Sequence, residues 1–357
     1  MTTSIRRERV RERIAGLCRS KAPSRQFRAA VLDQLRHAVG FDFYVFVLTD
    51  PQTSVGCDPL ADVPLLDDLP RLIRLKYATA VNRWTTLGEP PVALLFESTA
   101  GRREESLLWR EMLEAAGIVD VASMVFRDRF GCWGFLDLWR GTPGAPFTAA
   151  DADFLAMIAP MVTTALRRCQ AATFTVHPGG GAPREALVLL LSPDLTLRAQ
   201  TQQTGDYLRR LLPTPAEQSP IPAAAYNVAA QLAAIEAGVD DHAPSARVHL
   251  GQGVWVSLRA ARIGDGRQRP ADGDLSADIA VTIEHASPAE RLDVFGRAFA
   301  FTAREAELLT VLADGADTRQ AAAQMHLSMH TVQDHLKSIF DKVDSRSRRE
   351  LLARALG

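Results

Sequence analysis

This chain of 357 residues has few cysteines and no pattern that would pair them. Cys18, Cys57, Cys132 and Cys169 lie far apart, without a CxxC pair or the Cys/His spacing of a zinc site. We therefore expect neither a disulfide framework nor a structural zinc site, and the sequence favours a reducing, cytoplasmic compartment. Nothing else in the sequence indicates a cofactor, so none is expected.

Long apolar runs and catalytic signatures are missing as well. No stretch of 18 apolar residues occurs, and no apolar segment follows the arginines near the N-terminus, so neither a membrane-spanning helix nor a secretory signal is expected. Walker and Rossmann fingerprints, a Ser-His-Asp order and a receiver-type acidic pocket are absent. His242 beside Asp240 and Asp241 has no further residue at ligand spacing. We expect a protein that is not an enzyme and has no membrane partner.

Charge is balanced overall but unevenly distributed. The formal net charge is −1 at pH 7, yet residues 1–40 carry ten basic and three acidic side chains, a net of +7, whereas residues 302–357 carry eight of each. Residues 1–23 are expected to form a basic N-terminal arm, either an exposed helix face or a disordered arm, and its contact with DNA is left open. The length predicts two or three folded domains.

A first domain is predicted at residues 24–172. The pattern indicates a helix capped by Ser24, a buried strand, a hairpin and a long helix that begins at the capping pair Thr148 and Asp151. These elements occupy residues 24–39, 41–48, 119–127 with 132–140, and 148–169.

The segment Gly131–Trp139, followed by Phe147, Thr148 and Asp151, resembles part of a GAF-type sensory domain. The resemblance implies an antiparallel sheet with helices on one face and a pocket on the other. Tryptophans are candidate contacts for an apolar ligand in such a pocket, although aromatic residues on strands and helices also build cores. The candidates are Trp84, Trp109, Trp133 and Trp139.

A Pro/Gly-rich linker at residues 173–185 precedes a second predicted domain, residues 186–286. Five short strand-like runs occur there, with two helical runs between the second and the third. This order resembles that of a PAS domain, so both domains are expected to be α+β. Residues 287–300 are expected to connect them to a C-terminal all-α module.

That module, residues 301–357, predicts four short helices, each with its own start signal. The capping residues are Thr302, Asp317, Ser328 and Ser347. In the third helix, apolar residues fall within about 40° on a helical wheel and are expected in the core. They are Val332, Leu336, Ile339 and Val343. Polar residues face away, as a DNA major groove requires: His330, Gln333, Asp334, Lys337 and Asp341.

The module resembles the LuxR/FixJ/NarL type of helix-turn-helix domain. The resemblance is carried by Phe301–Glu305, Leu308, Leu309, Gly315, Ala322, Leu327, Ser328, Thr331, Val332, His335, Leu336, Ile339, Phe340, Lys342, Ser347, Arg348, Glu350 and Leu351. It implies a four-helix fold in which the third helix enters the major groove and the fourth commonly pairs two protomers.

The resemblance places Gln333, Asp334 and Lys337 where base edges are read. Lys337 can donate to guanine O6 and N7, Gln333 can bond adenine at N6 and N7, and Asp334 can accept from cytosine N4. The other candidate DNA-binding residues are His330, Thr331, Lys342 and Arg348. In the alternative interpretation, Gln333 and Asp334 are solvated residues on a helix that only orients the domain.

The sequence thus predicts a cytoplasmic transcription regulator that binds double-stranded operator DNA. A module without net charge releases few counterions and binds DNA weakly alone, so two protomers, or the basic N-terminus, would be needed for useful affinity. A homodimer is expected. A small-molecule effector or a partner would shift the pairing of two modules. The alternative is a ligand-binding sensor that acts by protein–protein interaction and uses the helix-turn-helix as a dimerisation unit.

Overall fold

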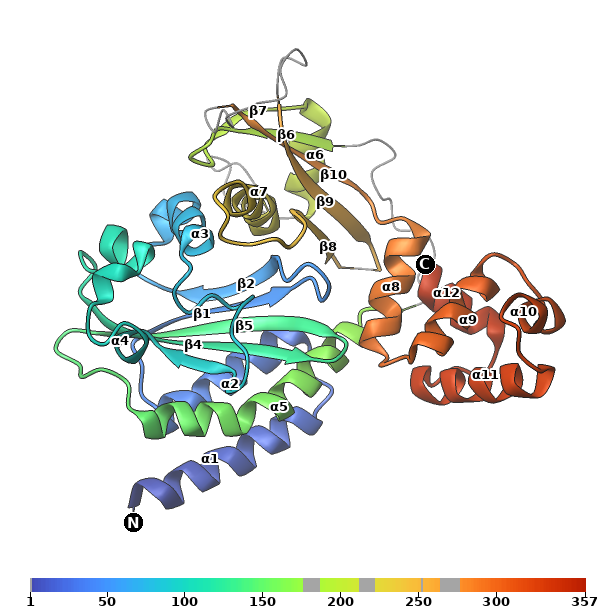
Figure 1. The fold of residues 1–357 in the computed structure, drawn as a ribbon, viewed down its shortest axis with the longest axis horizontal. Coiled ribbons are helices and arrows are strands. Elements are labelled where there is room, and N and C mark those ends of the chain that lie inside the picture. Colours follow the sequence, from blue (N-terminus) through green and yellow to red (C-terminus); the bar gives the residue numbers. More distant parts are fainter. Residues whose placement is uncertain (1, 176–186, 212–221, 252, 264–276) are drawn as a thin grey trace.

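The computed structural model describes residues 2–175, 187–211, 222–251, 253–263 and 277–357. These residues form two five-stranded antiparallel sheets with helices, followed by a helical C-terminal module (Figure 1). The predicted order of α+β regions followed by an all-α region is confirmed. Residues 176–185 of the predicted linker lie outside the described residues.

The first sheet belongs to what we call the first unit, residues 2–175. Its strands are β1 (Phe43–Thr49), β2 (Gly56–Asp62), β3 (Val92–Leu94), β4 (Ile118–Asp128) and β5 (Gly131–Gly141), in the order β2-β1-β5-β4-β3. Phe46 in β1 lies opposite Leu60 in β2 and Leu136 in β5. Burial along β4 and β5 is nearly continuous, which shows that both faces of this sheet are covered.

Three long helices lie on one side of the first sheet, with the N-terminal one outside the other two, and a shorter helix lies on the other side (Figure 1). The three are α1 (Thr2–Arg19), α2 (Ser24–Ala38) and α5 (Ala149–Ala171), and the fourth is α3 (Leu69–Ala78). The Thr148 side chain and Asp151 form the predicted capping box at the start of α5. Short helical turns complete the unit: η1 (Leu66–Asp68), α4 (Leu95–Ser98), η2 (Arg103–Glu105) and η3 (Trp109–Leu113).

The N-terminal segment differs from the expected arm. Residues 2–19 form α1, which packs against α2 and α5 through the buried residues Val10, Ile14 and Cys18. The Arg7 guanidinium pairs with Asp151 and donates to the Ala150 carbonyl oxygen. The physical reason is the i, i+4, i+8 spacing of the three apolar residues, which gives an otherwise basic helix one narrow face to bury.

Among the described residues, α5 is the helix that is long and apolar enough to cross a bilayer. Half of its most apolar stretch is buried, and α5 packs on β4 and on α1. The helix therefore has the character of a core helix.

The second unit, residues 187–285, repeats the strand order of the first. Its strands are β6 (Leu187–Leu191), β7 (Leu197–Gln200), β8 (Ser245–His249), β9 (Trp255–Arg262) and β10 (Ile279–His285), in the order β7-β6-β10-β9-β8. Two helices, α6 (Gln202–Leu211) and α7 (Ala223–Glu236), lie between β7 and β8 in the chain. Burial alternates along β6 and β10, so this sheet has one well-covered face.

Helix α7 lies between the two sheets (Figure 1). It packs on α3 and β2 of the first unit and on β9 of its own unit. Its alanine-rich sequence is buried on several sides, as expected for a helix enclosed by other layers. The second unit thus supplies part of the cover for the first sheet.

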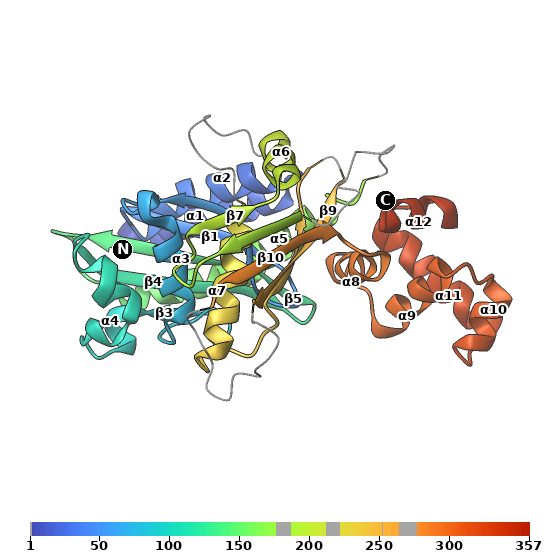
Figure 2. The ribbon, with the colours of Figure 1, turned by 90° about the horizontal axis from the view of Figure 1, so that it is seen from above.

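The connector at residues 287–300 contains helix α8 (Pro288–Ala298), which begins at a capping box between Ser287 and Glu290. The module follows as α9 (Ala303–Ala313), α10 (Thr318–Gln324), α11 (Met329–Val343) and α12 (Arg348–Leu356). The module lies at one end of the molecule, next to α8 (Figure 2). One continuous hydrophobic cluster runs from the first unit through α8 into the module.

Aromatic rings complete this junction between the three parts. Phe174, just after α5, stacks on Trp255 of β9 with ring centroids 4.8 Å apart and meets Phe295 of α8 edge-on at 5.1 Å. Phe295 in turn meets Phe301, at the start of the module, at 5.8 Å. The module is therefore connected to both units through α8 and Phe174.

Candidate nucleic-acid interface

The four helices of the module begin where their capping residues predict. Side chains of Thr302, Asp317, Ser328 and Ser347 each accept a hydrogen bond from a backbone N–H in the first turn of their helix. Gly315 has φ +95° after α9, a left-handed conformation that glycine adopts without steric strain. His326 takes a similar conformation (φ 54°) in the turn between α10 and α11. These local signals set the helix-turn-helix geometry.

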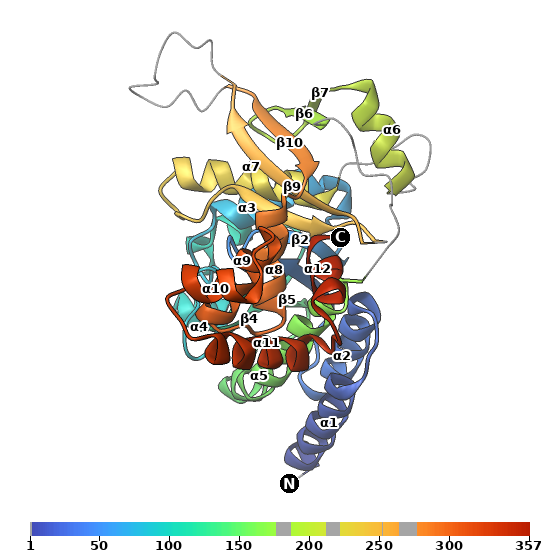
Figure 3. The same cartoon turned by 90° about the vertical axis from the view of Figure 1, so that its right-hand side faces the viewer.

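Helix α11 has one buried face and one exposed face, as predicted. Val332, Ile339 and Val343 are buried, and Leu336 is half-buried. The polar residues on the opposite side are all exposed: His330, Gln333, Asp334, Lys337 and Asp341. Viewed from the module's end, α11 runs across the front of the molecule (Figure 3). Its polar face is therefore available to a macromolecular partner.

Two of these polar residues form an exposed contact. The His330 Nδ1 lies 3.1 Å from an Asp334 carboxylate oxygen one helical turn later. A hydrogen bond with its own backbone and the charge of Asp334 together raise the pKa of His330. This contact lies at the N-terminal half of α11, and protonation of His330 would make it an ion pair.

Lys342 and Arg348 lie in different surroundings. The Lys342 ammonium donates to Glu305 Oε2 at 2.5 Å and to the Ala300 carbonyl oxygen at 3.2 Å. Arg348 donates to the carbonyl oxygen of Leu312 at the end of α9. Both residues therefore support the packing of the module in this structure, and their contact with DNA stays a prediction.

Glu305 is buried at the centre of this support. Burial opposes its charge, but hydrogen bonds from Lys342, from the Ser338 hydroxyl (2.6 Å) and from the Thr302 N–H (2.6 Å) lower its pKa to about 2. A single carboxylate thus joins the start of α9 to the second half of α11.

Thr331 has a capping role. Its N–H donates to Ser328 Oγ at 3.0 Å and the two hydroxyl groups lie 2.9 Å apart. Thr331 therefore fixes the first turn of α11, next to the exposed residues of the candidate interface.

A second candidate site lies in the first unit, where a cavity of about 60 Å³ opens between the first sheet, α3 and α7. Its walls are largely apolar, and Ala223 and Asn227 of the second unit form part of them. The one buried ion pair in the lining joins Lys76 Nζ to Asp137 Oδ2 at 2.6 Å. Binding in this cavity would involve both units.

Trp139 is the predicted ligand residue that lines this cavity. It is 1% exposed, and its indole N–H has no hydrogen-bond partner in the structure. Trp84, Trp109 and Trp133 lie outside the cavity lining, because their rings pack in the core and their N–H groups are already used. They donate to the Ser54 carbonyl, the Ile118 carbonyl and the Asp128 carboxylate, respectively.

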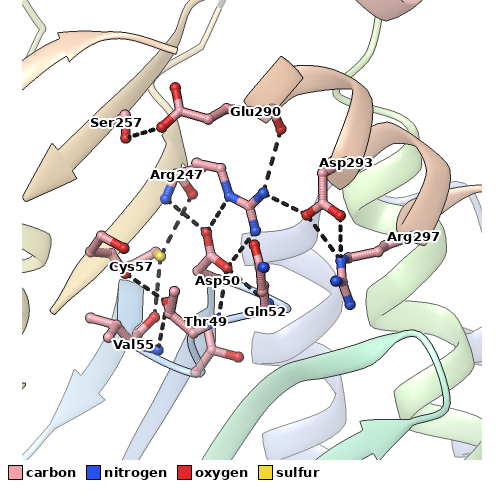
Figure 4. A network of polar contacts seen from close by, with 12 residues as sticks. Thr49, Asp50, Gln52, Val55, Cys57, Arg247, Ser257, Glu290, Asp293 and Arg297 are labelled. Carbon is pink, nitrogen blue, oxygen red and sulfur yellow. Dashed lines mark hydrogen bonds and ion pairs between the residues drawn. The ribbon is translucent and has the colours of Figure 1, made fainter. Parts of the chain in front are cut away.

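The two units and α8 meet at a network of buried charges (Figure 4). Asp50, fully buried after β1, accepts hydrogen bonds from the backbone and side chain of Arg247 in β8 at 2.7–2.8 Å. Arg247 also donates to Asp293 of α8 at 2.6 Å, and Asp293 accepts from Arg297. Burial opposes the charge of Asp50, but its bonds with Arg247 lower the pKa of this carboxyl.

The sequence interpretation missed this network. Asp50 and Arg247 are 197 residues apart, so no local pattern joins them. The one available signal is a charged residue between two apolar neighbours, Ala246 and Val248. The same signal marks Asp137, which lies within the apolar run of β5.

In the cluster of Asp240, Asp241 and His242, the Asp240 carboxylate pairs with a cation of the protein itself, Arg83. Asp240 Oδ2 accepts from Arg83 Nε at 2.6 Å and from the Thr85 hydroxyl at 2.7 Å. Its other oxygen accepts from the backbone N–H groups of Asp241 and His242. The carboxylate therefore holds the second unit to the first through Arg83.

The match that comparison with known proteins gives lies in the C-terminal module. No curated protein matches the chain, and no family match covers the two units, so the GAF-like and PAS-like resemblances stay predictions. Residues 300–355 match the family described as bacterial regulatory proteins, luxR family. This region is a LuxR-family helix-turn-helix domain, which indicates a DNA-binding transcription regulator.

Proposed function

We propose that the chain is a sequence-specific regulator of transcription that works as a cytoplasmic homodimer and responds to a small molecule. In this proposal α11 enters the major groove and its exposed polar face reads the base edges. Gln333 and Lys337 carry the readout, with Asp334 and His330 beside them. The observation that supports the proposal most directly is the exposure of all four side chains on a helix whose other face is buried.

The proposed pairing of two protomers is based on the net charge of the module. Residues 302–357 have no net charge, so one module gains little from neutralising phosphates. Two modules on a two-fold operator would add their contacts. In this structure α12 is held to α8, because Arg291 donates to the carbonyl oxygens of Arg354 and Ala355. Pairing through α12 would use its remaining surface.

The effector would bind in the cavity beside Trp139. A small apolar molecule with one hydrogen-bond acceptor would match the largely apolar lining, which includes Trp139 with its unpartnered indole N–H, and the volume of about 60 Å³ limits the size of that molecule. Because α7 of the second unit closes this cavity, a ligand there would act on the packing of the two units. The Asp50–Arg247–Asp293 network then links that packing to α8 and the module.

A gel-shift assay on genomic fragments selected with the full chain tests DNA binding. We expect salt-sensitive binding, and Gln333→Ala and Lys337→Ala should each lower discrimination between correct and altered sites by about 1–3 kcal/mol. Arg102→Ala, which removes one exposed charge on the first unit, is the matched control and should leave discrimination unchanged. Failure to bind any fragment would contradict the proposal.

The neutral charge of the module also favours a second candidate, a sensor that acts through protein–protein interaction with the helix-turn-helix as its dimerisation unit. Asp334 on the exposed face also favours this second candidate, because a carboxylate repels phosphates. A stable dimer that binds no selected fragment at low salt would identify this function.

A further inference from the structure

A basic cleft lies where the first unit meets the module. It has a volume of about 450 Å³ and is bounded by the α1–α2 connection, the end of α5, the end of α8, and the helices α11 and α12. Six basic residues line it: Arg19, Lys21, Arg167, Arg168, Lys342 and Arg354. Within the described part of the chain, the lining contains no carboxylate. This concentration of positive charge contrasts with a chain whose net charge is −1.

Four of the six cations already have partners outside the cleft. Arg167 pairs with Asp128 at 3.1 Å and Lys342 with Glu305 at 2.5 Å. Arg168 and Arg354 donate to the backbone carbonyl oxygens of Cys18 and Phe174. Two carboxylates against six cations leave a local excess of four positive charges, so the neighbouring protein groups do not neutralise the cleft.

Arg19 and Lys21 are the other two cations of the lining. Both are exposed, and neither pairs with a carboxylate among the described residues. Arg19 ends α1 and Lys21 follows in the connection to α2, so both are fixed beside the basic end of α5. Arg19 and Lys21 therefore add two donors without a carboxylate partner to the lining of the cleft.

We propose that this cleft binds a small phosphorylated molecule with at least two linked phosphate groups, such as a nucleoside di- or triphosphate. Several phosphates match an excess of about four charges, and arginine and lysine are the side chains that recognise them. The volume lies in the range of small-molecule sites. A recess of this volume between packed helices admits a small anion.

A bound anion would bridge the two parts of the molecule. Arg19, Lys21, Arg167 and Arg168 come from the first unit, whereas Lys342 and Arg354 come from the module. Without an anion these cations repel one another across the cleft. The ligand would therefore strengthen the docking of the module on the first unit, at a place separate from the cavity beside Trp139.

Isothermal titration calorimetry of the full chain with inorganic tripolyphosphate and with ATP, in the absence of DNA, tests the proposal. The double variant R19Q/K21Q should weaken the binding of tripolyphosphate at least tenfold. The matched variant R9Q/R13Q removes the same charge from exposed positions of α1 outside the cleft and should change it less than twofold. Equal urea midpoints for the two variants would show that both remain folded.

Tighter binding of ATP than of tripolyphosphate would support a nucleotide as the ligand, and equal binding would support recognition of the phosphate chain alone. Absence of saturable binding to the wild type at millimolar concentration would overturn the proposal. So would equal weakening by both double variants, which would indicate a diffuse field. In a separate gel-shift assay, a loss of affinity for duplex DNA in R19Q/K21Q, together with unchanged tripolyphosphate binding in the titration, would overturn the proposal and assign the two residues to DNA. Because the titration contains no DNA, its failure leaves the proposed regulator function untouched.

Discussion

The two sheet units and the module use charge in different ways. In the units, buried charges pair over long distances in sequence: Asp50 with Arg247, Arg83 with Asp240, and Lys76 with Asp137. In the module, exposed charges pair within one helical turn, as His330 does with Asp334 and Arg304 with Glu307. The difference indicates that charge in the units fixes how their parts pack, whereas charge on the module surface remains free for another molecule.

The largest effect is expected from Arg247→Met. This change leaves Asp50 buried without its partner and removes the link to Asp293, so the free energy of unfolding should fall by about 3–5 kcal/mol. Urea unfolding at pH 7 measures it. Arg259→Met, in β9 of the same sheet, breaks a pair with Glu290 of α8 in which the arginine side chain is 61% exposed, and should change stability by less than about 1 kcal/mol. Equal losses of stability in the two variants would contradict the proposed difference between buried and exposed charge pairs.

Lys76→Met tests the buried pair in the cavity of the first unit. Asp137 is 3% exposed, and without the ammonium its charge has lost the partner that offsets burial. We expect a loss of about 2–3 kcal/mol in the free energy of unfolding. Arg71→Met on the same helix removes an exposed cation and serves as the control. An unchanged urea midpoint for Lys76→Met would show that the pair contributes nothing to packing.

Glu305 is the exception within the module, because it is buried, and its effect should depend on pH. Its pKa is lowered to about 2 in the folded chain, so the stabilisation is complete above the ordinary value near 4.5 and is lost as pH falls towards 2. Between pH 5 and pH 3 the free energy of unfolding should fall by about 1–2 kcal/mol more for the wild type than for Glu305→Gln. Urea unfolding followed by helical circular dichroism measures both. Parallel pH profiles would contradict a role for the Glu305 carboxylate.

The smallest effect is expected from His330→Ala. Its side chain is 84% exposed, and the pair with Asp334 is open to solvent. Thermal unfolding at pH 7 should therefore show no resolvable change in Tm. A clear decrease in Tm would mean that the exposed face of α11 also serves packing.

Much of the module could be predicted from the sequence because its determinants are local. Thr302 and Glu305 are three residues apart, and the spacing of Val332 and Ile339 assigns one face of α11 to the core. The strands β1, β4 and β5 of the first unit and all five strands of the second were predicted for a similar reason, since apolar runs between turn residues indicate them. Strand β2, which contains Asp58 and Pro59, and the three-residue strand β3 were not predicted. Local patterns also marked α1: Val10, Ile14 and Cys18 repeat at helical spacing, a signal outweighed by the surrounding arginines.

What could not be predicted depends on contacts between distant residues. Nothing near Arg247 indicates that its partners are Asp50 and Asp293. The place of α7 between the sheets depends equally on both units. Lys342 shows the same limit within the module, because helical spacing cannot tell a residue that bonds Glu305 from one that contacts DNA.

Guanine N7 methylation interference on a selected operator tests most directly that the exposed face of α11 reads bases. Methylation at N7 blocks the major-groove acceptor that Lys337 is proposed to use. We predict interference at discrete guanines with the wild type, and loss of interference at one guanine per half-site with Lys337→Ala. Binding that tolerates methylation at every guanine, or an interference pattern identical for wild type and Lys337→Ala, would contradict the account.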